Sequence, residues 1–146
     1  MQFFKDRLAS AVQYADFVFG NETEAAAWGA ANGLEGASVE EVALAISALP
    51  KLGRAGRTVV ITQGAKETIV ATTGVSATTA VPVVPIAADA IVDVNGAGDA
   101  FVGGFLAATA AGKDVETACR VGNWAAGEVI QFSGCAFDKT RACPLM

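Results

Sequence analysis

Apolar and polar residues follow one another along the chain in a pattern that predicts alternating helices and strands. Apolar side chains recur at near-helical spacing over residues 3–14, which predicts an amphipathic helix. The apolar residues 17–19, together with Asp16 before them, then predict a short buried strand. The β-branched run at 58–62 is typical of a fully buried central strand, and a strand at 67–72 follows after a short turn, so the two form a hairpin.

Capping residues mark where two further helices begin. Asn21 is a good N-cap for a helix over residues 22–31, whose first turn is acidic. Ser38 and Glu41 have the spacing of a capping box. They predict a helix that runs to about residue 49, where a proline stops it.

The second half of the chain combines extended segments, a glycine loop and two helices. Residues 73–92 are rich in Thr, Val, Ala and Pro and predict extended segments with breaks at the prolines. The glycine loop at 93–99 precedes helices from about 99 to 111 and from 115 to about 132. This order predicts an α/β fold with a mostly parallel sheet and an antiparallel portion, in one domain without a linker.

Composition and charge exclude several classes of protein. The chain has 146 residues, of which 53% are hydrophobic and 17% charged, so it is no disordered tail. A net charge of -5 argues against a nucleic-acid or anionic-membrane partner, because no broad basic face neutralises phosphates. The chain contains no histidine, which excludes histidine-based triads, general bases and zinc sites.

The cysteines and the carboxyl end point to an unmodified cytoplasmic protein. Three cysteines without CxxC spacing form neither a metal knuckle nor a disulfide framework, so we expect a reducing, cytoplasmic setting, with a nuclear one left open. The last four residues, 143–146, formally fit a prenylation motif. Pro144 is a poor aliphatic position in that motif, and a solvated tail is the better interpretation.

The glycine loop carries the most informative chemistry in the chain. Gly96 and Gly98 allow the backbone to approach a ligand closely, and the loop leads directly into a helix start. Unpaired N–H groups and the positive end of a helix dipole make such a place suitable for phosphate. Asp99 follows in the first turn, where a carboxylate could accept a proton from a hydroxyl that attacks phosphorus. A tight turn with Asp99 as a capping residue is the simpler alternative.

Four segments, which begin at Asn21, Thr62, Asp93 and Ser133, match a known combination of motifs. Together they resemble the ribokinase-like (PfkB) family of sugar and nucleoside kinases, and most of all its adenosine-phosphorylating members. The resemblance implies the C-terminal part of a ribokinase-like αβα sandwich, with the N-terminal half and the lid absent and residues 1–146 forming a single partial domain. The matching segments are the Asn21-x-x-Glu24 segment, Thr62-Gln63-Gly64 with Thr68, the glycine signature from Asp93 to Leu106, and Ser133-Gly134-Cys135.

The resemblance also implies an activity and assigns roles to residues. It implies transfer of the γ-phosphoryl group of ATP to the 5′-hydroxyl of adenosine, giving AMP, with ATP, Mg²⁺ and in some members a monovalent cation. The matched residues are Asp99 as catalytic base; Asn95, Gly96, Ala97 and Gly98 as anion hole; Thr62, Gln63, Gly64 and Asn123 beside the nucleotide; Asn21 and Glu24 at Mg²⁺, through water; and Asp93 at the monovalent cation.

Simpler roles remain open for these residues. Asn21 and Glu24 could only cap a helix, residues 62–64 could form an ordinary hairpin turn, and Asn123 could be a surface or capping group. Asp93 could simply end a strand.

The sequence also departs from the family. Val94 stands where the family usually has Thr, and an arginine that neutralises phosphate charge has no counterpart in the matched regions. Because the acceptor pocket lies largely outside this chain, two alternatives stay open. One is a kinase of the same family for another sugar or nucleoside, and the other is a non-catalytic nucleotide-binding fragment.

Overall fold

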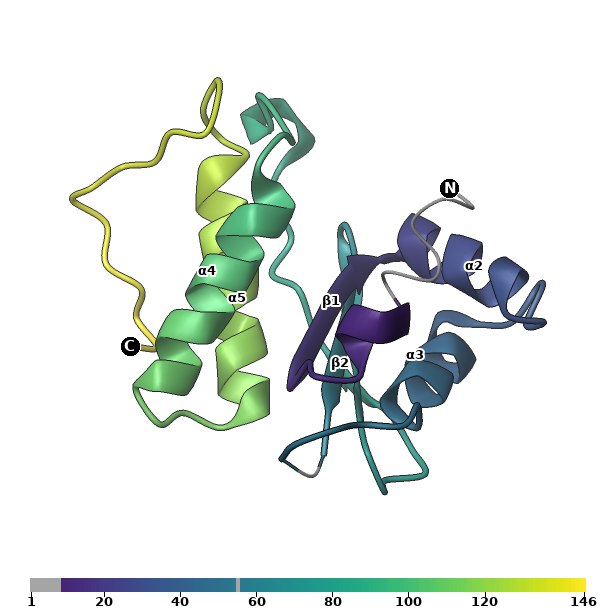
Figure 1. Ribbon diagram of the computed structural model, residues 1–146. Coiled ribbons are helices and arrows are strands. Elements are labelled where there is room, and N and C mark those ends of the chain that lie inside the picture. Colours follow the sequence, from purple (N-terminus) through teal and green to yellow (C-terminus); the bar gives the residue numbers. More distant parts are fainter. Residues whose placement is uncertain (1–8, 55) are drawn as a thin grey trace. The chain divides into compact units, whose positions relative to one another are not determined.

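The computed structural model describes residues 9–54 and 56–146, and their helices and strands follow the order predicted from the sequence (Figure 1). Residues 9–12 are helical, whereas 3–8 of the first predicted helix lie outside the described residues. The elements are β1 (Phe17–Asn21), α2 (Glu22–Ala31), α3 (Val39–Ser47), β2 (Thr58–Gln63), β3 (Lys66–Thr72), β4 (Thr79–Val81), a 3₁₀ turn η1 (Ala88–Ala90), α4 (Ala97–Ala110) and α5 (Val115–Val129).

The strands form one mixed sheet in the order β1-β2-β3-β4, which confirms the predicted α/β class. β1 and β2 are parallel, with Phe17 opposite Thr58 and Asn21 opposite Thr62, and the other pairs are antiparallel. The hairpin between β2 and β3 turns at Gly64, whose φ of 60° is the left-handed conformation that a tight hairpin turn requires at its first position. In residues 73–92 only Thr79–Val81 forms a strand.

The described residues divide into two compact units. The first comprises the described residues up to Gln63 together with Ile69–Ala80, and the second comprises Gly64–Thr68 and Val81–Met146. Among the described residues, no helix is long and apolar enough to cross a membrane.

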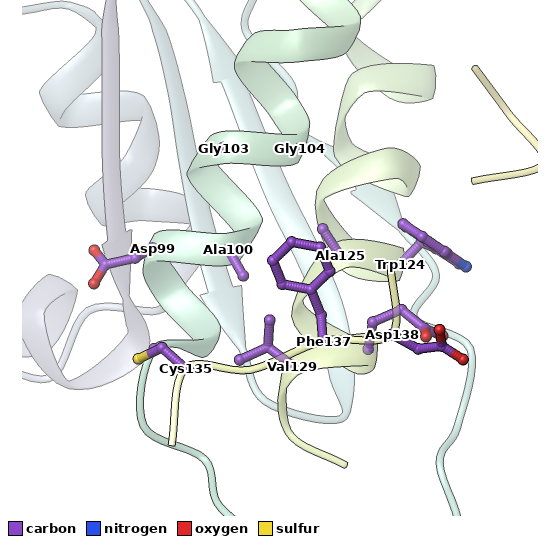
Figure 2. Close-up of a pocket in the computed structure, with 12 residues that line it drawn as sticks. Asp99, Ala100, Gly103, Gly104, Trp124, Ala125, Val129, Cys135, Phe137 and Asp138 are labelled. Atoms are coloured by element: carbon purple, nitrogen blue, oxygen red, sulfur yellow. The ribbon is translucent and has the colours of Figure 1, made fainter. Parts of the chain in front are cut away.

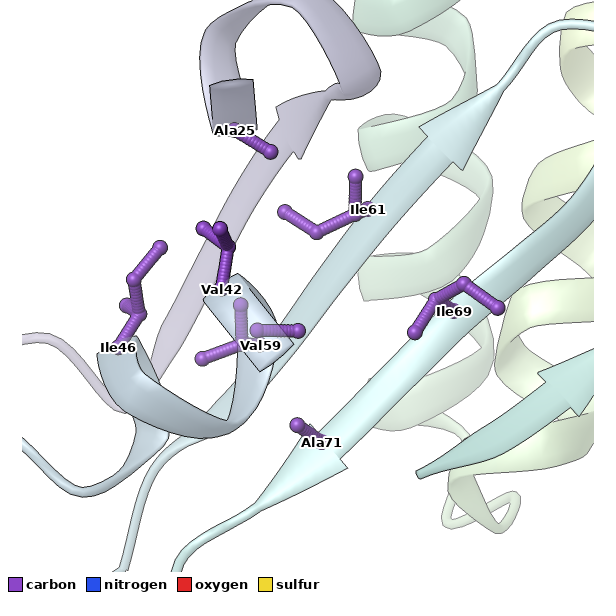
Figure 3. Packing of buried hydrophobic residues seen from close by; sticks show 8 residues of the cluster. Ala25, Val42, Ile46, Val59, Ile61, Ile69 and Ala71 are labelled. Atoms are coloured by element: carbon purple, nitrogen blue, oxygen red, sulfur yellow. The ribbon is translucent and has the colours of Figure 1, made fainter. Parts of the chain in front are cut away.

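The core of the first unit lies where α2 and α3 cover one face of the sheet (Figure 3). Alternate residues of β2 and β3 point into it, as period-two strands require. Val60, between two of these residues, is also fully buried, which confirms that β2 is buried on both faces. The buried cluster consists of Ala25, Val42, Ala43, Ile46, Val59, Ile61, Ile69 and Ala71.

Arg57 is buried in the first unit and binds carbonyl groups at the C-terminal end of α3. Its side chain is 1% exposed, and its guanidinium donates to the carbonyls of Ile46 (2.9 Å), Leu49 (3.0 Å) and Val12 (2.6 Å). The last carbonyls of a helix lack partners within the helix, so a planar cation with several donors suits this position. Burial lowers the pKa of Arg57. This arginine is therefore structural.

In the second unit, α4 and α5 pack closely through glycines. A Cβ on Gly104 would lie 2.9 Å from the carbonyl oxygen of Val121, and one on Gly122 would lie 2.8 Å from that of Phe101. Gly103 does not share this role, because a Cβ there would meet nothing within 4 Å. Close packing therefore depends on one glycine of each helix.

Candidate functional site

Asp93 fixes the start of the glycine loop. Its Oδ1 accepts the N–H of Asn95 at 2.9 Å, and its Oδ2 accepts the N–H of Gly134 at 3.1 Å. These two N–H groups lower the pKa of Asp93, because they favour the charged carboxylate. Asp93 therefore does more than end an extended segment: it holds the loop and the segment after α5 together.

The glycine loop begins α4 without a side-chain cap. Gly96 is the N-cap residue, and its φ of 80° explains why glycine stands there. The N–H of Ala97 donates to the carbonyl of Val94 at 3.3 Å, and that of Asn95 is held by Asp93. Within the described chain, the N–H groups of Gly96, Gly98 and Asp99 have no hydrogen-bond acceptor. Three donors at a helix N-terminus form an arrangement suited to an anion.

Asp99 is the third residue of α4 and is exposed. Its carboxylate points away from Phe137 and Ala125 (Figure 2), and no hydrogen bond or ion pair engages it among the described residues. It is available to accept a proton from a ligand beside the three N–H groups.

A cavity of about 610 Å³ lies beside this loop, between α4, α5 and the segment after α5 (Figure 2). Its wall is mainly apolar, and three acidic residues, Asp99, Glu128 and Asp138, contribute to its lining. Glu128 is 6% exposed and pairs with Arg141 at 2.8 Å. The other residues of the wall are Gly96, Ala100, Gly103, Gly104, Trp124, Ala125, Val129, Cys135 and Phe137.

Asn123 faces β3 from α5. The hydroxyl of Thr68, which is fully buried, donates to its Oδ1 at 3.0 Å, whereas its buried Nδ2 has no partner among the described residues. Asn123 is therefore not a simple surface group. Its free donor is a feature that an acceptor on a ligand could satisfy.

Asn21 and Glu24 form a capping box at the start of α2, in the first unit. The N–H of Glu24 donates to Asn21 Oδ1, and the N–H of Asn21 donates to Glu24 Oε2, each at 2.9 Å. Thr62 lies opposite Asn21 and its hydroxyl donates to the carbonyl of Gly20 at 3.4 Å. These residues meet at the carboxyl ends of two parallel strands, where α/β sheets commonly bind ligands. Gln63 ends β2 beside them.

A magnesium ion is compatible with this group of residues. In the described ranges there is no cluster of three or more His, Cys, Asp or Glu side chains that could hold a metal. Mg²⁺ keeps several waters and commonly takes only one or two carboxylates besides phosphate oxygens, so a lone carboxylate such as Glu24 suits it.

Two contacts behind the glycine loop were not predicted from the sequence. The sulfur of Cys135 lies so close to Gly96 that a Cβ on Gly96 would be 2.7 Å from it. The Gly134 N–H reaches Asp93 from 41 positions away. The only signal in the sequence was the Ser133-Gly134-Cys135 match, which gives no spatial neighbour.

Three of the chain's five arginines are engaged in other contacts, and Arg54 is exposed. Arg57 is buried at the end of α3, and Arg120 pairs with Glu116 one helical turn away at 2.6 Å. Arg141 pairs with Glu128. Arg7 lies outside the described residues.

Known proteins resemble this chain over nearly its whole length. The sequence model of the pfkB family of carbohydrate kinases matches residues 1–142. Adenosine kinase 1 of Arabidopsis thaliana is 46% identical over 139 residues, which are 94% of this chain and 40% of the plant protein. The adenosine kinase of Schizosaccharomyces pombe is 45% identical over 134 residues, which are 91% of this chain and 39% of the yeast protein.

Solved structures agree with this similarity. The adenosine kinase of Schistosoma mansoni in complex with 2-fluoroadenosine has a TM-score of 0.89 at 34% identity, over 94% of this chain and 41% of its own. That of Trypanosoma brucei brucei (apo) has a TM-score of 0.83 at 39% identity, over 90% of this chain and 39% of its own. This chain thus spans about 40% of the length of the relatives that it matches. It belongs to the pfkB family of carbohydrate kinases.

Proposed function

We propose that this chain is the phosphate-binding and base-carrying part of an adenosine kinase, which transfers the γ-phosphoryl group of ATP to the 5′-hydroxyl of adenosine and gives AMP. The observation that carries the proposal is the trio of unpartnered N–H groups at Gly96, Gly98 and Asp99 beside the free Asp99 carboxylate. Support comes from the 46% identical plant adenosine kinase. The adenosine kinase of Schistosoma mansoni, 33% identical, has been solved with adenosine and AMP.

The N–H groups stabilise charge on the transferred group. They lie at the N-terminus of a helix of 14 residues, so its dipole adds to their effect. Donors that are fixed before the reaction stabilise developing charge without the cost of reorganisation. Asn95 and Ala97 contribute by shaping the loop, since their own N–H groups are already bonded inside the protein.

Asp99 is the proposed general base. It takes the proton of the 5′-hydroxyl as the oxygen attacks the γ-phosphorus, and the bond from phosphorus to the bridging oxygen of ADP breaks. Asp99 holds that proton until AMP leaves. The carboxylate repels phosphate in the ground state, so it contributes to turnover rather than to nucleotide affinity.

The remaining residues bind nucleotide and cations in this proposal. Glu24 and Asn21 hold Mg²⁺ through water, and the ion would neutralise phosphate charge. The carboxylate of Asp93 has about four lone-pair sites, of which two accept N–H groups. The other two would coordinate a monovalent cation. Residues 62–64 line the nucleotide, and Asn123 offers its free Nδ2 to it. The three free cysteines fit a reducing compartment, the cytosol.

Two other functions follow from specific observations. The ribokinase of Thermotoga maritima has a TM-score of 0.74 at 26% identity, so a sugar acceptor is the first alternative. A nucleotide-binding fragment without turnover is the second, because about 60% of the relatives' length has no counterpart in this chain.

The test is nucleotide binding followed by turnover. Calorimetry measures binding of ATP and ADP with Mg²⁺ to the 146-residue chain. Phosphorylation of adenosine is then assayed with the chain alone and together with the segment of Arabidopsis adenosine kinase 1 that the chain does not match. Asp99→Asn should bind nucleotide and lose turnover. The matched control, Asp114→Asn at the N-cap of α5, should keep both, because Asn caps a helix as well as Asp.

The outcomes separate the candidates. Turnover of adenosine supports the proposal, and turnover of a sugar instead supports the first alternative. Binding without turnover under either condition supports a nucleotide-binding fragment. No binding by a folded, monodisperse chain contradicts all three.

A further inference from the structure

The segment after α5 is tied to the glycine loop by one carboxylate. One carboxylate oxygen of Asp93 accepts a hydrogen bond from the Asn95 N–H, and the other accepts one from the Gly134 N–H. An ionised carboxylate makes stronger hydrogen bonds with N–H groups than a neutral acceptor does. Asp93 therefore joins two stretches of chain that are 41 positions apart.

Two further contacts reinforce this connection. The carbonyl of Ile130, just after α5, accepts the N–H groups of Val92 (2.8 Å) and Asp93 (3.2 Å). The sulfur of Cys135 lies against Gly96, in the space that a Cβ on Gly96 would need. The loop is thus held from behind by Ile130, Gly134 and Cys135, while its unpartnered N–H groups belong to the start of α4.

α5 ends at Val129, a few residues before the end that the sequence predicts, and the same contacts keep the helix from resuming at Gly134. A continued helix would need the Gly134 N–H to donate to the Ile130 carbonyl, four residues back. That carbonyl is already bonded to Val92 and Asp93, and the Gly134 N–H is bonded to Asp93. The Ile130 carbonyl and the Gly134 N–H therefore form their hydrogen bonds with the start of the loop and not within a helix.

We infer that Asp93 is a positioning residue and that residues 133–135, which we call the strap, hold the glycine loop in its anion-binding shape. The inference rests on the proposed function. A loop with two glycines has much conformational freedom to lose when a ligand orders it. Because the strap orders the loop before a ligand binds, nucleotide binding does not lose affinity to the conformational entropy of ordering the loop.

The test compares Asp93 with Asp114, because each carboxylate accepts two hydrogen bonds but only Asp93 lies at the glycine loop. Asp93→Ala removes acceptors for two N–H groups behind the loop. Asp114→Ala removes the acceptor for the N–H and the hydroxyl of Thr117 at the start of α5. Both variants lose hydrogen bonds of the same kind, so both should melt at a lower temperature. Only Asp93→Ala should weaken ADP binding, by about tenfold, while Asp114→Ala stays within about twofold.

Binding is measured by calorimetry with Mg-ADP in a buffer whose only other cation is tetramethylammonium. This condition removes any effect that Asp93 would have through a bound potassium or sodium ion. Equal ADP affinities for Asp93→Ala and Asp114→Ala, once both are shown to be folded, overturn the inference and leave the proposed function intact.

Amide hydrogen exchange gives a second measurement that needs no ligand. In Asp93→Ala the amides of Gly96, Gly98 and Gly134 should exchange faster than in Asp114→Ala. If the native chain binds no nucleotide, the proposed function fails, and exchange alone then decides whether the strap orders the loop. Equal exchange rates at these amides in the two variants overturn the inference.

Discussion

The N-termini of α2 and α4 are built from similar parts and used in opposite ways. Each helix has an acidic residue at its third position, Glu24 in α2 and Asp99 in α4. At α2, Asn21 and Glu24 exchange two hydrogen bonds with the backbone, so the terminus is closed by its own side chains. At α4 the N-cap is Gly96, which has no side chain to donate or accept.

The difference shows that the N-cap residue decides whether a helix start is a closed structural end or an open anion site. A side-chain cap satisfies N–H groups that a helix cannot satisfy itself, and it thereby removes them from any ligand. A glycine cap leaves them open, and the structure must then fix the loop by other means. Here Asp93 and the strap provide that support.

The largest expected effect is the loss of turnover when Asp99, at the N-terminus of α4, is replaced. In the complemented kinase assay, Asp99→Asn should lower turnover by about a thousandfold, because the amide cannot accept the hydroxyl proton. Its ADP affinity should stay the same or rise. Turnover close to that of the unchanged chain would show that Asp99 is a capping residue like Glu24 and not a base.

The second effect concerns the glycine cap itself. Gly96→Ala should destabilise the chain by roughly 1–2 kcal/mol through its left-handed backbone, and by about 1 kcal/mol more through contact with the Cys135 sulfur. Gly112→Ala, with a φ of 76° and open space around it, should show the backbone cost alone. The measurement is urea unfolding of both variants. Equal losses would mean that Cys135 turns aside and does not hold the loop.

The sequence predicted these two termini to very different degrees. The cap at α2 is local, because both partners lie within four residues, and the residue type of Asn21 before an acidic first turn was enough to predict the N-cap. The capping box at Ser38 and the buried strand β2 were predicted for the same reason. The support of the α4 terminus joins residues 41 positions apart, and no spacing rule reaches that far. The sequence therefore predicted the glycine loop and the helix that follows it, but not the contacts that hold the loop.

The third effect separates capping from ligand binding at the closed terminus. Asn21→Ala and Ser38→Ala each remove the N-cap side chain of a complete capping box, so each should cost about 1 kcal/mol of folding free energy. If Asn21 also serves Mg²⁺ and phosphate, only Asn21→Ala should weaken Mg-ADP binding, by about threefold to tenfold. Calorimetry at equal Mg²⁺ concentration checks this. Equal Mg-ADP affinities of Asn21→Ala and Ser38→Ala would show that Asn21 only caps the helix.

The smallest effect follows from the titratable group that holds the loop before α4, the carboxylate of Asp93. Because the folded chain lowers the pKa of Asp93 below its ordinary value of 3.8, its contribution to stability is fully present well above that value and is lost as the pH falls through the folded pKa. The difference in melting temperature between the unchanged chain and Asp93→Asn should therefore be constant above about pH 5 and shrink progressively as the pH falls below it. Asp114 and Asp138 also have lowered pKa values, but they titrate alike in both proteins and cancel in the difference. A difference that began to shrink above pH 5 would mean that Asp93 is not held by the N–H groups of Asn95 and Gly134, and the open terminus would then need another support.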